Sequence, residues 1–166
     1  GIVGMGRVGR AVAKRAAAFE CPIYYTDLIE MADVPYGFVP ELVELAHQSD
    51  ALILCAAADK AEGIINAKVL EALGKDGFLI NIARGKLVNE ADLVAAINAG
   101  TIAGAGLDVF VDEPNVPEAF LQNDSVVMQA HRASATWETR TAMGNMVLES
   151  LAHGLSGIRP KMSLTT

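Results

Sequence analysis

The chain has 166 residues, a length that suits one domain with one sizeable hydrophobic core. Hydrophobic residues make up 52% of it, which argues against disorder, and the longest apolar run, 51–58, is too short to span a bilayer. The net charge of −7, without basic runs, argues against binding to nucleic acid or to anionic membranes. Because no signal-peptide pattern opens the chain, we expect a cytoplasmic protein.

Short apolar runs alternate with helical patterns along the whole chain. The predicted strands are 2–3, 23–26, 51–55, 78–82, 102–107 and 126–128. The predicted helices are 8–19, 41–47, 67–73, 90–99 and 136–155. Strands that are apolar on both faces indicate a parallel sheet covered by helices on both sides. Right-handed crossovers then give a doubly wound, Rossmann-like α/β fold.

Apolar stripes on two of these helices predict which of their faces are buried. In helix 8–19 the stripe consists of Val8, Val12 and Phe19. In helix 136–155 it consists of Met143, Met146, Val147 and Leu151. The two cysteines, Cys21 and Cys55, lie in or beside apolar runs without CxxC spacing, so we interpret them as buried free thiols and expect neither a disulfide nor a metal site.

Glycine and charged residues recur directly after the predicted strands. These positions are Gly4 to Gly9, Asp27, 56–59, 83–85, Asp108 and His131. In an open parallel sheet the carboxyl ends of the strands share one edge, and ligands bind there. The loop 111–124 is long, acidic and carries two prolines, and loops of that length in compact domains are often functional.

The first of these strand ends carries a GxGxxG pattern. Gly4 permits a tight turn, Gly6 lets the backbone approach a pyrophosphate, and Gly9 lets the helix pack on the strand. The phosphates then face the amides at the helix N-terminus. The pattern alone is weak evidence, but here it follows a predicted strand and opens a predicted helix, as dinucleotide binding requires.

Asp27 closes the second predicted strand, where a carboxylate accepts hydrogen bonds from the adenosine ribose hydroxyls and repels a 2′-phosphate. A plain turn residue is the alternative reading. Leu28 follows at a position where an NADP site usually has a basic residue. We therefore favour NAD over NADP as the cofactor.

Three further residues are candidates for chemistry on a substrate. Arg84 follows a buried strand and can hold a carboxylate with two hydrogen bonds, although a surface arginine is the alternative. His131 follows the last short strand and can act as a general acid or base. Glu113, in the long loop, would raise the pKa of His131 if the two side chains touched; the alternative is a solvated loop acid.

At these residues the chain resembles the D-isomer-specific 2-hydroxyacid dehydrogenase family, over nearly its whole length. The matching stretches are 1–9, 79–85, 103–110, 112–114 and 131–136. The run 112–117 looks most like the branch of glyoxylate, hydroxypyruvate and hydroxyphenylpyruvate reductases. The family's pattern is broken in three places: Ala56 to Ala58 stand where a proline and a threonine are usual, Val111 replaces an acid, and Ala130 replaces a proline.

The resemblance implies hydride transfer between NAD(H) and a small 2-oxo or 2-hydroxy acid. Arg84 would bind the substrate, His131 would protonate the carbonyl oxygen, and Glu113 would pair with His131. The implied cofactor-binding residues are Gly4, Gly6, Arg7, Val8, Gly9, Asp27, Ala56, Ile82, Ala83, Asp108 and Ala133. Arg7 and Val8 would give amides to the pyrophosphate, Asp108 would bond the nicotinamide side, and Ile82 and Ala83 would offer it backbone contacts.

The family also has a second domain that closes over the cofactor. Because this chain begins inside a predicted strand, we expect a fragment that lacks the N-terminal substrate domain and is inactive alone. Residues 1–150 would form the dinucleotide-binding domain, and 151–166 would return to the substrate domain. Homodimers are common in the family and are expected here.

Two other readings stay open at this point. A non-catalytic NAD-sensing module, similar to dehydrogenase-like transcriptional corepressors, can keep the same Arg, Glu and His residues. A relative of phosphoglycerate or formate dehydrogenases would share the fold and differ in substrate.

Overall fold

The computed structural model describes residues 1–57 and 61–160. The chain divides after Ala130 into two compact units, residues 1–130 and 131–166. The expected boundary at residue 150 separates a dinucleotide-binding domain from a segment that returns to the substrate domain. It is not a boundary between compact units, and it stays a prediction.

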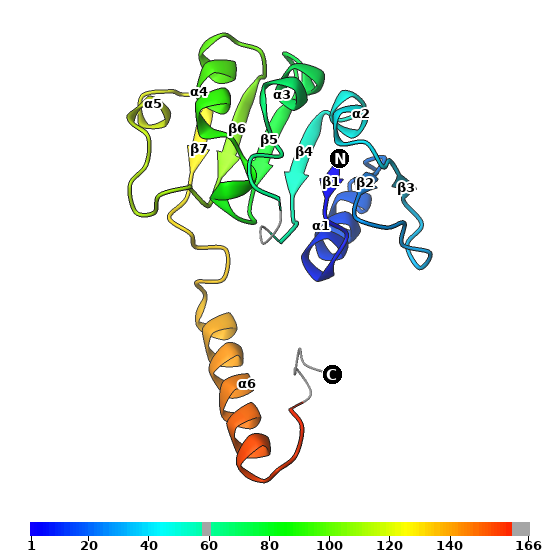
Figure 1. The fold of residues 1–166 in the computed structure, drawn as a ribbon, viewed down its shortest axis with the longest axis vertical. Helices are drawn as coiled ribbons and strands as arrows, with labels where there is room; N and C mark the ends of the chain where they lie inside the picture. The colour runs from blue at the N-terminus through cyan, green and yellow to red at the C-terminus, as the bar shows by residue number, and fades with distance from the viewer. Residues whose placement is uncertain (58–60, 161–166) are drawn as a thin grey trace. The chain divides into compact units, whose positions relative to one another are not determined.

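The described part of the first unit contains a seven-stranded sheet in which all neighbouring strands are parallel, in the order β3-β2-β1-β4-β5-β6-β7 (Figure 1). The strands are β1 (Ile2–Val3), β2 (Tyr24–Thr26), β3 (Gly37–Phe38), β4 (Ala51–Leu54), β5 (Phe78–Asn81), β6 (Gly104–Leu107) and β7 (Val126–Met128). The helices are α1 (Arg7–Ala17), α2 (Leu42–His47), α3 (Ala67–Leu73), α4 (Glu90–Asn98) and α5 (Glu118–Leu121), with a 3-10 turn at Gly85–Leu87.

The core has two parts, one on each face of the sheet. Successive residues of a strand point to opposite faces, and Ile2 and Val3 of β1 belong to different apolar clusters. The Ile2 cluster contains Ala13 of α1 and Tyr25 of β2. The larger Val3 cluster contains the buried residues of α2, α3 and α4. The sheet therefore has helices on both faces, which confirms the predicted doubly wound, Rossmann-like fold.

The predicted buried face of the first helix is wrong at Val8 and Phe19, whereas Val12 is half-buried and packs against the Ile2 cluster. Val8 and Phe19 are 52% and 83% exposed, and the buried residues of α1 are Gly9 and Ala13. A Cβ at Gly9 would lie 2.0 Å from the carbonyl oxygen of Gly4, so the helix rests on the strand through its smallest residues. Phe19 lies beyond the helix end at Ala17, where the helical stripe no longer holds.

The second unit contains one long helix, α6 (Trp137–Leu155), which begins at a cap in which Thr136 Oγ1 accepts a hydrogen bond from the Thr139 amide. None of its residues is buried, so the prediction that its methionine stripe is core is wrong for the described residues. The stripe residues Met143, Met146, Val147 and Leu151 are 44, 43, 58 and 57% exposed. No helix among the described residues is both long enough and apolar enough to cross a membrane.

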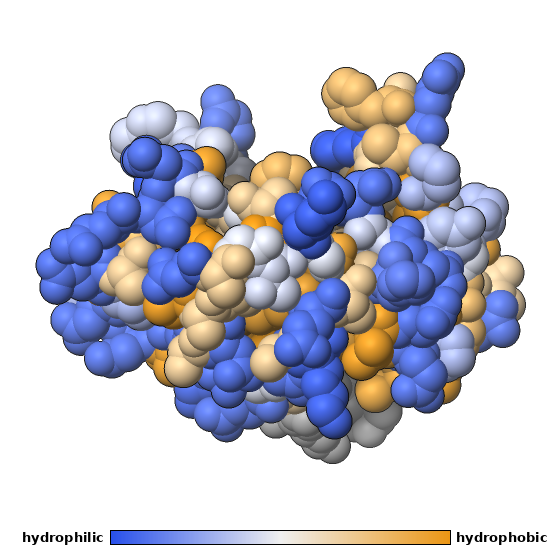
Figure 2. Space-filling view, turned by 90° about the horizontal axis from the view of Figure 1, so that it is seen from above, coloured by the Kyte–Doolittle hydropathy of each residue, from blue (hydrophilic) through white to orange (hydrophobic). Residues whose placement is uncertain are grey.

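The two described thiols are free but differ in environment. Cys21 is exposed, so its predicted burial is wrong, because it lies in the surface turn after α1 rather than in a strand. Cys55 is half-buried at the end of β4, and burial raises the pKa of its thiol to about 11. On the face shown in Figure 2, hydrophilic and apolar residues are interspersed.

We expect Leu79→Ala to destabilise the protein by about 2–5 kcal/mol, because Leu79 is fully buried in the interior strand β5 and its loss leaves a cavity. Urea unfolding followed by circular dichroism measures the change. Val127→Ala, on β7 and 68% exposed, is the control and should change the free energy of unfolding by less than about 1 kcal/mol. Equal effects of the two variants would contradict the assigned core.

Candidate functional site

The register of the sheet aligns the last residues of six strands in one row. Val3 pairs with Thr26 on one side and with Leu54 on the other. Beyond Leu54 the row continues through Asn81, Leu107 and Met128. The residues after this row share one edge of the sheet. The structure therefore brings the predicted positions Gly4, Asp27, Ala56, Ile82 and Asp108 to the same edge.

The glycine loop between β1 and α1 is shaped by contacts that leave no room for side chains. Gly4 has a φ of +94°, and a Cβ there would lie 2.7 Å from the Ala56 backbone. Its amide donates to the carbonyl of Thr26 at 2.9 Å, which ties the loop to the end of β2. This packing accounts for Ala56, a small residue, at the end of β4.

The start of α1 fits a phosphate group. Gly6 is the N-cap residue and offers no side-chain cap, and the first turn contains no acidic residue. A Cβ at Gly6 would meet nothing within 4 Å, and Arg7 and Val8 are exposed. Unsatisfied amides and the positive end of the helix dipole favour an anion at such a terminus.

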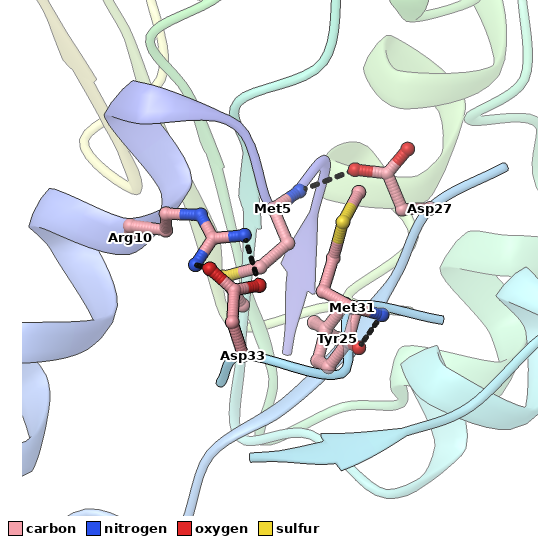
Figure 3. A network of polar contacts seen from close by, with 6 residues as sticks. All are labelled: Met5, Arg10, Tyr25, Asp27, Met31 and Asp33. Atoms are coloured by element: carbon pink, nitrogen blue, oxygen red, sulfur yellow. Dashed lines mark hydrogen bonds and ion pairs between the residues drawn. The ribbon is translucent and has the colours of Figure 1, made fainter. Parts of the chain in front are cut away.

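Asp27 is fixed at the end of β2 by two backbone amides. Its Oδ2 accepts a hydrogen bond from the Met5 amide and its Oδ1 accepts one from the Leu28 amide, each at 2.7 Å. Figure 3 shows the first of these bonds, which joins the middle of the glycine loop to the neighbouring strand end. Each carboxylate oxygen has a second lone pair, so Asp27 can still accept a ribose hydroxyl.

Asn81 organises the turn that follows β5. Its side chain is 1% exposed. The Asn81 Oδ1 accepts a hydrogen bond from the Ala83 amide at 3.1 Å, and Nδ2 donates to the Arg84 carbonyl at 2.9 Å. The turn presents Arg84 as an exposed residue whose Nη1 donates to the Ala83 carbonyl at 2.6 Å. The guanidinium is thereby oriented by the same turn that carries Ile82.

Asp108 lies directly after β6 and is 7% exposed. Its amide donates to the Asn81 carbonyl at 3.0 Å, which links the ends of β5 and β6. Burying a carboxylate costs free energy unless the carboxylate is hydrogen-bonded. The Asp108 carboxylate is therefore suited to accept hydrogen bonds at this edge of the sheet.

Two carboxylates hold the first part of the loop after β6. Glu113 Oε1 accepts a hydrogen bond from the Phe110 amide at 3.0 Å, and Glu90 Oε1 accepts one from the Val111 amide at 2.9 Å. Glu113 itself is exposed. The predicted irregular loop also contains the short helix α5, whose Phe120 is buried in the larger core cluster.

The predicted catalytic residues fall in both units. Arg84 and Glu113 belong to the first unit, and His131 and Ala133 belong to the second, where both are exposed. His131 has a φ of +52°, a left-handed conformation that histidine adopts more readily than most residues. The predicted contact between Glu113 and His131 stays a prediction.

Sequence reasoning missed the polar residues that support the site rather than line it. From the sequence, Asn81 and Glu90 are only parts of a predicted strand and a predicted helix, and no motif marks Arg10 or Tyr25. For Asn81 a signal did exist, since an amide that ends an apolar run of strand residues must find partners when buried.

Residues 1–133 match a known protein family, described as D-isomer specific 2-hydroxyacid dehydrogenase, NAD binding domain. The chain belongs to this family. The match covers the whole first unit and the first three residues of the second.

Two relatives of known name are reductases. The chain is 44% identical to glyoxylate/hydroxypyruvate reductase A of Arabidopsis thaliana, over 95% of this chain and 50% of the relative. It is 47% identical to 2-ketogluconate reductase of Gluconobacter oxydans, over 91% of this chain and 49% of the relative. The chain thus spans about half the length of the curated relatives that it matches.

A solved structure from the same family has the same fold. It is the NADPH-dependent glyoxylate/hydroxypyruvate reductase of Sinorhizobium meliloti in complex with NADP and malonate, with a TM-score of 0.91 and 44% identity. The match covers 93% of this chain and 49% of the other. These findings agree with the resemblance drawn from the motifs, including its reductase branch.

We expect Asn81→Ala to destabilise the protein by about 1–3 kcal/mol, because it leaves a buried amide and a partly buried carbonyl without their partner. Thermal and urea unfolding measure the effect. Asn98→Ala is the matched control, since Asn98 is exposed at the end of α4 and its Oδ1 accepts a long, 3.5 Å hydrogen bond from the Asn123 side chain. If Asn81→Ala were as stable as this control, the assigned role of Asn81 would be wrong.

Proposed function

We propose that the protein is an oxidoreductase that reduces a small 2-oxo acid to the 2-hydroxy acid, and that this chain binds the nicotinamide cofactor. The observation that carries the proposal is the single row of strand ends. It gathers the glycine loop, Asp27, the Arg84 turn and Asp108 at one edge of the sheet. The names of the relatives support the same reaction and favour it over a non-catalytic NAD-sensing module.

The cofactor, when bound, supplies a hydride from C4 of its nicotinamide to C2 of the substrate. Arg84 holds the substrate carboxylate and stabilises the charge that develops on the carbonyl oxygen. His131 donates its proton to that oxygen, so the carbonyl becomes a hydroxyl and the imidazole becomes neutral. Glu113 would pair with His131 and orient its imidazole for the step.

We propose that the cofactor lies along the row of strand ends. Gly4, Gly6 and Gly9 allow its pyrophosphate to approach the amides of Arg7 and Val8. The residues that would hold the nicotinamide half are Ala56, Ile82 and Ala83 through their backbone, Asp108 through its carboxylate, and Ala133. The uncapped start of α1 and the position of Asp108 after β6 support this arrangement.

We further propose NAD rather than NADP as the preferred cofactor. The Asp27 carboxylate is held in place by two amides at the end of β2, where it accepts ribose hydroxyls and repels a 2′-phosphate. Leu28, the next residue, is 98% exposed and brings no positive charge. The Sinorhizobium meliloti relative is NADPH-dependent. The proposed preference for NAD therefore rests on Asp27 and Leu28 of this chain and not on that relative. A cytoplasmic location and a homodimer stay predictions.

We expect His131→Ala to lower the turnover of the complete gene product about 10²–10⁴-fold, because the carbonyl oxygen loses its proton donor. NADH oxidation with glyoxylate, hydroxypyruvate and phenylpyruvate-type acids measures this. His47→Ala, an exposed histidine in the last turn of α2, is the matched control and should keep wild-type turnover. Unchanged turnover in His131→Ala would refute the assigned acid.

An inactive wild-type protein that captures regulatory partners in stoichiometric amounts would favour the NAD-sensing module instead. Residues 1–166 alone should bind NAD without turnover.

We expect Asp27→Asn to weaken NAD⁺ binding about tenfold and to reduce the preference for NAD⁺ over NADP⁺, because the substitution removes the negative charge while an amide oxygen remains for the Met5 amide. Isothermal titration calorimetry with both dinucleotides measures the two affinities. Asp76→Asn removes the same charge from an exposed turn before β5, at the opposite end of the strand, and serves as the control. An unchanged preference in Asp27→Asn would contradict the role of Asp27.

A further inference from the structure

The segment that follows β2 is acidic and has no cation of its own. Residues 27–36 contain Asp27, Glu30 and Asp33 and no lysine or arginine. The adjoining helix α1, however, carries an arginine, Arg10, one turn after the glycine loop, and its amide donates to the Gly6 carbonyl at 3.0 Å. This arginine is a potential partner for a phosphate at the adenosine end of a cofactor.

Arg10 is already engaged by Asp33. Its two terminal nitrogens donate to the two carboxylate oxygens of Asp33, each at 2.8 Å, which is the bidentate geometry that arginine and carboxylate favour (Figure 3). Both side chains remain accessible, at 36% for Arg10 and 74% for Asp33. The hydrogen bonds with Arg10 lower the pKa of Asp33, which favours its charged form.

The backbone that carries Asp33 is held in place independently of this ion pair. The Met31 amide donates to the hydroxyl of Tyr25 at 2.7 Å, and Tyr25 is fully buried in β2. The Val34 amide donates to the Met31 carbonyl at 3.3 Å. Asp33 therefore lies in a turn that is anchored to a buried residue. Because this turn is already ordered, the ion pair with Arg10 costs less conformational entropy than a pair between two mobile surface residues.

We infer that Asp33 acts as a specificity-determining residue, because it holds Arg10 in an ion pair and so withholds it from the 2′-phosphate of NADP. The inference rests on the proposed dinucleotide site and extends it to residues that would not touch NAD. Figure 3 draws the Arg10–Asp33 pair and the Met5–Asp27 bond in one network of polar contacts around the start of α1 and the end of β2, where the proposed function puts the adenosine ribose. A free arginine there would offer the charge that Leu28 does not supply.

The test compares four variants of the chain by calorimetry with NAD⁺ and NADP⁺. Asp33→Asn, which removes the charge but keeps the shape, should tighten NADP⁺ binding about tenfold and change NAD⁺ binding less than about twofold. Asp33→Glu, which keeps the charge, should preserve the wild-type ratio of affinities. Arg10→Gln combined with Asp33→Asn should restore that ratio, since no arginine is left to release. Asp76→Asn, the matched loss of one negative charge, should change neither affinity.

Three results would overturn the inference. One is an unchanged ratio in Asp33→Asn, and another is a gain in NADP⁺ affinity that persists in the double variant, because the gain would then come from reduced repulsion alone. The third is a wild-type chain that binds neither dinucleotide, which would also refute the proposed function. A wild-type chain that binds NAD⁺ while Asp33→Asn has no effect would refute only the inference. Melting temperatures of all variants verify that each is folded.

Discussion

The close approach of α1 to β1 is the contact on which the site depends. At Gly9 the helix lies so near the Gly4 carbonyl that no Cβ fits between them, and Gly4 itself lies against the backbone of Ala56. These contacts place the uncapped start of α1 directly beyond the row of strand ends. A bulkier residue at either glycine would move the helix, and the amides proposed to hold a pyrophosphate would move with it.

Polar side chains in or next to the strands then fix the loops that follow them. Asn81 shapes the Arg84 turn, Asp27 joins β2 to the glycine loop, and the Tyr25 hydroxyl anchors the turn that carries Asp33. Each of these hydrogen bonds involves a residue in or next to a strand of the sheet. The loops are therefore tied to the rigid sheet. Such preorganisation is what both cofactor orientation and discrimination between dinucleotides require.

Periodicity and glycine spacing predicted the parallel sheet and the edge where its polar residues meet, because both follow from local patterns. They failed where tertiary contacts decide. Val8 and Phe19 match a helical stripe, but the helix packs through Gly9 and Ala13. The two-residue strand Gly37–Phe38 is too short to show a period, and the partners of Asn81 and Arg10 depend on chain geometry that no spacing encodes.

The central claim is that the row of strand ends binds a nicotinamide dinucleotide. Amide chemical shifts of the ¹⁵N-labelled chain, followed during titration with NAD⁺, test it most directly. The account predicts that the largest changes occur at Gly4 to Gly9, Asp27, Ile82 to Arg84 and Asp108, and that residues at the opposite ends of the strands change little. Changes confined to other surfaces, or no saturable change at all, would contradict it.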